Sequence, residues 1–147
     1  MRDFLAITGP TTSGKTQLSI TVAEALDGEI ICMDSRQVYR GMDIGTDKVS
    51  AEHRNRVPHH GLDLRDPDEF YSAGQFGRDA KGYIEEISGR GRVPLLVGGT
   101  GLFLRSLTHP IFKQPDIDAA RLQALRGFMA KRPRAELERW VGALDSD

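Results

Sequence analysis

The chain has 147 residues, 39% of them apolar and 28% charged, and its net charge is −1. These values describe a soluble globular protein with one substantial core, and the balanced charge gives no general case for nucleic acid binding. No apolar run reaches the ~20 residues of a membrane-spanning helix, which excludes a helical membrane protein. The first residues lead into a predicted strand without a secretory signal, and the single cysteine, Cys32, lies in an apolar run, so we expect a cytoplasmic location.

Strand and helix patterns alternate along the chain. Apolar runs predict strands at residues 4–8, 29–33, 59–64 and 93–97. Apolar periodicity and capping residues predict helices at residues 15–26, 50–54, 72–88, 101–107 and 118–131, and a last helix that starts near Pro133. The polar stretch 34–46 contains two glycines and is typical of a functional loop. This alternation predicts an α/β fold with a doubly wound, mostly parallel sheet.

The turn between the first strand and the first helix carries a phosphate-binding pattern, G-x-x-x-x-G-K-[ST]. We call this segment the phosphate loop, and it consists of Gly9, Pro10, Thr11, Thr12, Ser13, Gly14, Lys15 and Thr16. Its backbone N–H groups and the first turn of the helix suit a bound anion, as in P-loop NTPase-like nucleotide-binding proteins. Lys15 would place a positive charge on the terminal phosphates, and the Thr16 hydroxyl would ligate Mg²⁺. The alternative is a chance match in a capped turn.

An acidic residue follows one predicted strand and is missing after another. ATP- and GTP-hydrolysing enzymes with this loop normally hold Mg²⁺ with an Asp at the end of a second strand. The strand at 93–97 is followed by glycines and Thr100, which disfavours a motor or switch NTPase, whereas the strand at 29–33 is followed by Asp34. Because ligands bind at the carboxyl ends of parallel strands, Asp34, Thr100 and the phosphate loop should converge on one crevice. There Asp34 would be a general base, with a turn or helix cap as its alternative role.

Positive charge gathers toward the end of the sequence. Residues 105–139 contain eight Lys or Arg and four acidic residues, which leaves a local excess of four positive charges (8 − 4). Such a stretch could contact a nucleic acid backbone or could be the solvated face of two helices.

Several segments together resemble one family, the tRNA dimethylallyltransferases. The resemblance covers residues 4–125 and keeps the order and spacing of the family motifs. The phosphate loop reads GPTTSGKT, and the more diagnostic segment 34–46 reads DSRQVYRGMDIGT. Three shorter matches lie at residues 58–63, 71–76 and 97–101.

The resemblance implies transfer of a dimethylallyl group from its diphosphate to N6 of the adenine 3′-adjacent to the tRNA anticodon. The phosphate loop would then hold the diphosphate of the prenyl donor. Carried over by position, Asp34 would accept the proton of the attacking amine, and Thr16 would bind the donor phosphate or Mg²⁺. The contacts with the tRNA anticodon stem-loop would come from Asp34, Ser35, Arg36, Gln37, Thr100 and Arg121.

The sequence departs from the family at its C-terminal end. Family members continue with a helical insertion that grips tRNA, further basic motifs and another strand. We therefore divide the chain into a P-loop α/β core at 1–112 and the start of a helical tRNA-binding insertion at 113–147. We expect a truncated chain with an incomplete sheet and no prenyl transfer of its own, whereas a full-length member would be a monomer.

Other functions stay open at this point. A small-molecule kinase would share the phosphate loop and an acid after the second strand, although the chain lacks an arginine-rich lid segment and the 34–46 segment does not match. A related enzyme that prenylates free adenine nucleotides is a further alternative. A nucleotide-binding module without enzymatic activity is the last, and in it Asp34→Ala would change neither ligand binding nor activity.

Overall fold

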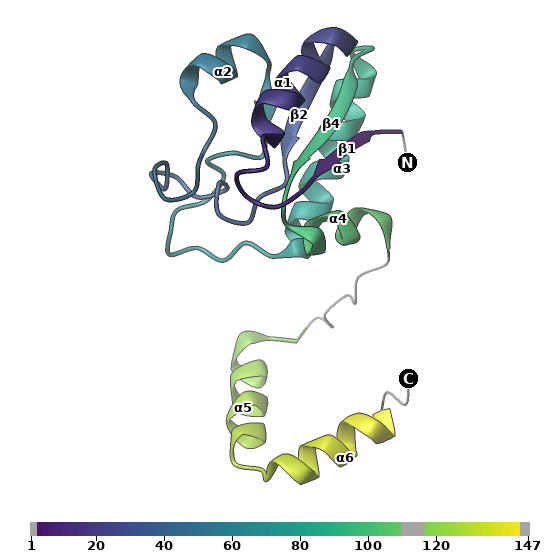
Figure 1. Cartoon of the computed structure of the whole chain (residues 1–147). Helices are drawn as coiled ribbons and strands as arrows, with labels where there is room; N and C mark the ends of the chain where they lie inside the picture. The colour runs from purple at the N-terminus through teal and green to yellow at the C-terminus, as the bar shows by residue number, and fades with distance from the viewer. Residues whose placement is uncertain (1–2, 110–116, 145–147) are drawn as a thin grey trace. The chain divides into compact units, whose positions relative to one another are not determined.

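The computed structural model describes residues 3–109 and 117–144 of the chain. It divides into two compact units, Met1–Phe112 and Lys113–Asp147 (Figure 1). The first unit combines a sheet with helices, and the second contains two helices. None of the described helices is both long and apolar enough to cross a membrane.

A parallel sheet of four strands forms the centre of the first unit. The strands are β1 (Leu5–Thr8), β2 (Gly28–Cys32), β3 (His59–His60) and β4 (Val93–Gly98). Their order across the sheet is β1-β4-β2-β3, and every pair is parallel. The predicted α/β class with a mostly parallel sheet is therefore confirmed. β1 has one strand neighbour within the described residues, and its Leu5 is 44% exposed, as expected of an open sheet edge.

Helices cover both faces of this sheet (Figure 1). α1 (Lys15–Leu26) covers one face, and α3 (Ala73–Gly89) and α4 (Gly101–Thr108) cover the other. The short helix α2 (Ala51–Arg56) has no buried residue. Because side chains alternate along a strand, Ile30 and Cys32 of β2 pack in one core with α1, and Ile31 and Met33 pack in the other with α3 and α4. All five residues of β2 are buried, so this strand lies inside the sheet and leads to the site.

Capping residues define where several helices begin, as predicted. Ser72 and Gln75 form a reciprocal capping box at the start of α3. In the second unit, α5 (Ala119–Ala130) follows Asp118, whose carboxylate accepts a 2.8 Å hydrogen bond from the N–H of Arg121. The chain then forms α6 (Arg134–Leu144).

The strand predicted at 59–64 is shorter than expected and ends at His60. Gly61 has a φ of +82°, and Asp63 also has a positive φ, 55°. A Cβ on Gly61 would lie 3.0 Å from the carbonyl oxygen of Cys32, so the chain turns away there at close range to β2. An extended strand cannot continue through this conformation.

Candidate functional site

The phosphate loop joins the end of β1 to the start of α1. Thr12 and Gly14 have left-handed backbone angles, with φ of 65° and 81°. A Cβ on Gly9 would lie 3.1 Å from Ser13 Oγ, so the loop is tight enough to favour glycine there. The Lys15 ammonium donates a 2.5 Å hydrogen bond to the Pro10 carbonyl, which holds its positive charge over the loop.

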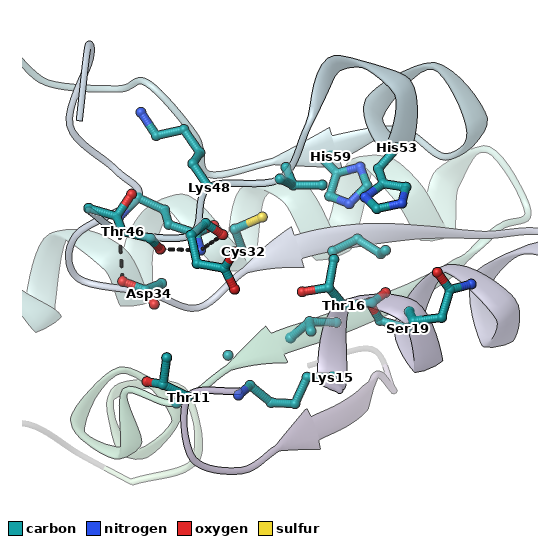
Figure 2. Close-up of a pocket in the computed structure, with 18 of the residues that line it drawn as sticks. Thr11, Lys15, Thr16, Ser19, Cys32, Asp34, Thr46, Lys48, His53 and His59 are labelled. Atoms are coloured by element: carbon teal, nitrogen blue, oxygen red, sulfur yellow. Dashed lines mark hydrogen bonds between the residues drawn. The ribbon is translucent and has the colours of Figure 1, made fainter. Parts of the chain in front are cut away.

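A pocket of about 480 Å³ opens beside this loop (Figure 2). Three groups of residues line it: residues 11–16 of the phosphate loop with the first turns of α1, the ends of β2 and β4 with Asp34, and Gln37 with several residues between Thr46 and His59. Gly9 and Pro10 of the loop do not line it. Figure 2 shows Lys15 and Thr16 on one side, His53 and His59 on the opposite side, and Asp34 toward one end. The structure thus brings Asp34 and the phosphate loop to one pocket, as the sequence predicted.

Asp34 both shapes the backbone and faces the pocket. Its Oδ1 accepts hydrogen bonds from the N–H groups of Arg36, at 2.7 Å, and Gln37, at 3.4 Å. The carboxylate therefore caps the turn at residues 35–38, which is the alternative role that the sequence left open. Asp34 Oδ2 accepts no hydrogen bond within the described residues, so one oxygen is fixed and the other is available to a ligand.

Two glycines let the end of β4 press against β2 and the phosphate loop. A Cβ on Gly98 would lie 2.0 Å from the carbonyl oxygen of Met33, and a Cβ on Gly99 would lie 3.2 Å from that of Gly9. The next residue, Thr100, accepts a 3.2 Å hydrogen bond at its Oγ1 from the N–H of Ser35. Thr100 does not line the pocket, but it fixes the turn that follows Asp34.

The wall opposite the phosphate loop, residues 46–50, is held by a lysine that the sequence analysis did not identify. The Lys48 side chain is 1% exposed, and its ammonium lies 2.7 Å from Asp63 Oδ1 and 2.8 Å from Asp43 Oδ1. It also donates a 2.6 Å hydrogen bond to the Tyr39 carbonyl. Burial opposes the charge, yet the two carboxylates outweigh burial and raise the pKa of Lys48. A buried, fully bonded ammonium thus fixes this wall.

The floor of the pocket is apolar and uncharged. Ile30, Cys32 and Val97 line it together with His59. Burial raises the pKa of the Cys32 thiol to about 12, so Cys32 is an interior side chain and no nucleophile. Burial also lowers the pKa of His59, whose Nδ1 lies 2.7 Å from the Val57 carbonyl. This region therefore suits an apolar group attached to an anion.

Other predicted residues lie outside this pocket. Ser35 and Arg36 are exposed, and Arg36 lines a second hollow of about 410 Å³ with the residues from Gly41 to Thr46. Arg121 belongs to the second unit. Within the part of the chain that the structure describes, no three His, Cys, Asp or Glu residues form a metal-binding group. Thr16, the predicted metal ligand, is an exposed residue that lines the pocket.

Known proteins of one family are similar to this chain in sequence. A sequence model of the family described as IPP transferase matches residues 37–147, and one described as isopentenyl transferase matches residues 2–58. A tRNA dimethylallyltransferase of Halorhodospira halophila is 47% identical over 143 residues, which cover 97% of this chain and 46% of the relative. One from an Anaeromyxobacter species is 44% identical over 147 residues, which cover 100% of this chain and 49% of the relative.

Solved structures give the same result. The full-length tRNA isopentenylpyrophosphate transferase of Bacillus halodurans superposes with a TM-score of 0.74 at 42% identity, over 100% of this chain and 49% of that one. A eukaryotic dimethylallyltransferase acting on tRNA superposes with a TM-score of 0.82 at 31% identity, over 96% and 35%. The chain spans about half the length of the curated relatives it matches. The chain belongs to the IPP transferase family.

Proposed function

We propose that this chain carries the donor-binding and proton-accepting part of a site that transfers a dimethylallyl group from dimethylallyl diphosphate to N6 of the adenine 3′-adjacent to the tRNA anticodon. The observation that carries the proposal is the meeting of Asp34 and the phosphate loop at a pocket with an apolar floor. The matched relatives are named for this activity on tRNA. Neither they nor the solved structures favour the kinase alternative.

The two ends of the donor suit the two sides of the pocket. The backbone N–H groups of the phosphate loop and the Lys15 ammonium would bind the diphosphate and stabilise it as it leaves. Ile30, Cys32 and Val97 would receive the five-carbon chain, because they offer apolar surface without charge. The reactive carbon would then lie between the phosphate loop and Asp34.

The proton of the incoming amine has an acceptor in this arrangement. As N6 attacks the allylic carbon, a C–N bond forms, the C–O bond to the diphosphate breaks, and diphosphate departs with the electron pair. Asp34 takes the proton that N6 loses. Since its Oδ1 is held by the Arg36 and Gln37 amides, Oδ2 is the oxygen that would accept this proton.

A divalent cation, Mg²⁺, fits the residues at the diphosphate end. Mg²⁺ is typically held by one or two protein oxygens together with substrate phosphates and waters. The Thr16 hydroxyl lines the pocket and forms no hydrogen bond within the described residues, so it would hold the ion with the diphosphate. The bound ion would neutralise charge on the leaving diphosphate.

The tRNA would approach the turn after Asp34 and the second unit. The proposed contacts are Asp34, Ser35, Arg36, Gln37, Thr100 and Arg121. The described part of the second unit has six Lys or Arg and three acidic residues, an excess of three positive charges (6 − 3). Two of the arginines pair with glutamates four residues on, at 3.7 Å and 2.6 Å, which leaves four basic side chains outside these two pairs. This surplus suits a phosphate backbone.

Ligand-dependent melting of the chain tests the proposal. Dimethylallyl diphosphate with Mg²⁺ should raise the melting temperature more than ATP with Mg²⁺, since binding at 100 times Kd stabilises by about 2.7 kcal/mol. Asp34→Asn should leave donor binding nearly unchanged, because the amide Oδ1 can still cap the turn. Stabilisation by ATP and none by the prenyl donor would contradict the proposal and favour a kinase.

A further inference from the structure

Gln37 uses its side chain inside the protein. Its Nε2 donates two hydrogen bonds of 3.1 Å each, to the carbonyl oxygens of Thr46 and Asp47. A side-chain amide has two N–H donors, so both are used. Thr46 and Asp47 are the first residues of the pocket wall opposite the phosphate loop. Gln37 therefore fastens this wall.

The backbone of Gln37 forms hydrogen bonds with Asp34 and Asp63. Its N–H donates to Asp34 Oδ1 at 3.4 Å, and its carbonyl accepts from the N–H of Asp63, also at 3.4 Å. Asp63 in turn binds the Lys48 ammonium at 2.7 Å. One residue thus joins the turn of the proposed base, the wall at Thr46 and Asp47, and the buried ion pair behind that wall.

The backbone of the wall adopts an unfavourable conformation that other contacts must stabilise. Asp47 has a φ of 51°, in the left-handed region that non-glycine residues seldom adopt. Within the wall, the amide of Lys48 donates to the Asp43 carbonyl at 3.2 Å, and the amide of Asp47 donates to that of Ile44 at 3.5 Å. Two hydrogen bonds from Gln37 on the carbonyls of Thr46 and Asp47 offset the cost of this conformation.

From these contacts we propose that Gln37 is a positioning residue, whose side-chain N–H groups place the pocket wall at Thr46 and Asp47 for the donor. Ser35 and Arg36 are exposed, and their side chains donate no hydrogen bond within the described residues, so both are available to RNA. The inference rests on the proposed function in one respect, that the pocket takes a prenyl diphosphate.

Two near-isosteric variants separate a positioning role from RNA contact. Gln37→Met keeps the size of the side chain and removes both donors, and Gln37→Glu places a carboxylate against two carbonyl oxygens. Gln123→Met, an exposed residue of α5, is the matched control. The readouts are hydrogen exchange of the Asp47 and Lys48 amides, affinity for dimethylallyl diphosphate with Mg²⁺ by calorimetry, and affinity for an anticodon stem-loop RNA.

We expect both variants to speed exchange of the two amides by about tenfold or more, with Gln37→Glu the stronger, because two hydrogen bonds are lost. Both should weaken donor binding several-fold at temperatures where near-ultraviolet circular dichroism shows the unit folded, which a role limited to stability would not do. Unchanged exchange and donor affinity, with loss of RNA affinity alone, would overturn the inference. If the unmodified chain does not bind the donor, the proposed function fails, and the exchange result alone decides the role of Gln37.

Discussion

Replacing Lys48 with methionine removes the ammonium that three parts of the chain share. Lys48 is 1% exposed and binds Asp63, Asp43 and the carbonyl of Tyr39 within 2.8 Å. Hydrogen bonds to charged groups contribute about 1.5–3 kcal/mol each when they are not exposed. Asp43 is 66% exposed, so its share is small. The Asp63 and Tyr39 contacts together, less the gain from burying the methionine side chain, give an expected loss of about 2–4 kcal/mol.

Tyrosine signals allow this loss to be measured for the first unit alone. All three tyrosines, Tyr39, Tyr71 and Tyr83, lie in the first unit, and the only tryptophan, Trp140, lies in the second. Near-ultraviolet circular dichroism of tyrosine should show melting lowered by about 10 °C or more for Lys48→Met. Lys81→Met, at an exposed position of α3, should change stability by no more than about 0.5 kcal/mol.

The pH dependence provides a second check with a defined sign. The pKa of Lys48 is raised, so its contribution is complete below the unfolded value, about 10.4, and is lost as pH rises through the folded value. Burial alone would raise the pKa of Asp63, but hydrogen bonds from Lys48 and Arg54 lower it. Its contribution is therefore present above about pH 4 and is lost on acidification. The stability difference between Lys48→Met and the unmodified chain should be flat between about pH 5 and 9 and shrink outside that range.

A double-mutant cycle with Asp63→Asn identifies the partner that carries the effect. If the ion pair is the main contribution, adding Asp63→Asn to Lys48→Met should cost less than Asp63→Asn alone, with a coupling of about 0.5–3 kcal/mol. Melting of Lys48→Met within about 2 °C of the unmodified chain would refute the reasoning, since it would show that the buried ammonium contributes nothing net.

Three further substitutions test other parts of the molecule. Lys15→Ala should weaken binding of inorganic pyrophosphate by about tenfold or more in calorimetry, because a charged donor is lost; equal affinity would remove Lys15 from the anion site. Cys32→Leu should reduce affinity for dimethylallyl diphosphate while pyrophosphate affinity stays the same, and a parallel loss of both would place the prenyl group elsewhere. Glu29→Gln should destabilise the chain by about 2–4 kcal/mol at pH 7, since Glu29 is 3% exposed and its Oε2 lies 2.8 Å from Arg90. Hydrogen bonds from Arg90 and His60 outweigh burial and lower the Glu29 pKa, so this difference should diminish as pH falls below about 4; a constant difference would argue against the charge.

Local sequence patterns were sufficient to predict the structural features that are formed by residues close together in the sequence. The phosphate loop, the capping box at Ser72 and the cap at Asp118 each arise from contacts within a few residues, and each is present in the structure. The prediction of a strand at 59–64 was wrong beyond His60. The backbone turns at Gly61, where it lies close to the end of β2, which is far away in sequence. Alternating hydrophobicity at 59–64 contains no information about that contact.

Long-range charge pairs were missed for the same reason. Lys48 meets Asp63 only because the chain doubles back after β3, and nothing at position 48 itself indicates burial. Glu29 is a charged residue at the start of a predicted apolar strand, and in the structure its carboxylate contacts Arg90, Arg92 and His60. A charge in a strand that is buried on both faces requires partners, so the sequence itself indicates that basic residues lie beside Glu29.

The geometry of the site follows from where β2 ends. Cys32 lies on the pocket floor, the Met33 carbonyl lies against Gly98, and Asp34 faces the phosphate loop, so three successive residues fix the floor, the packing and the carboxylate. Because a Cβ on Gly98 would lie 2.0 Å from the Met33 carbonyl oxygen, the absence of that side chain is what lets β4 approach β2 closely at this point. The phosphate loop is shaped by its own backbone, whereas the opposite wall depends on Gln37 and the buried charge of Lys48. A change in either of those anchors would therefore move the wall at residues 46–50 relative to the phosphate loop and leave the loop itself in place.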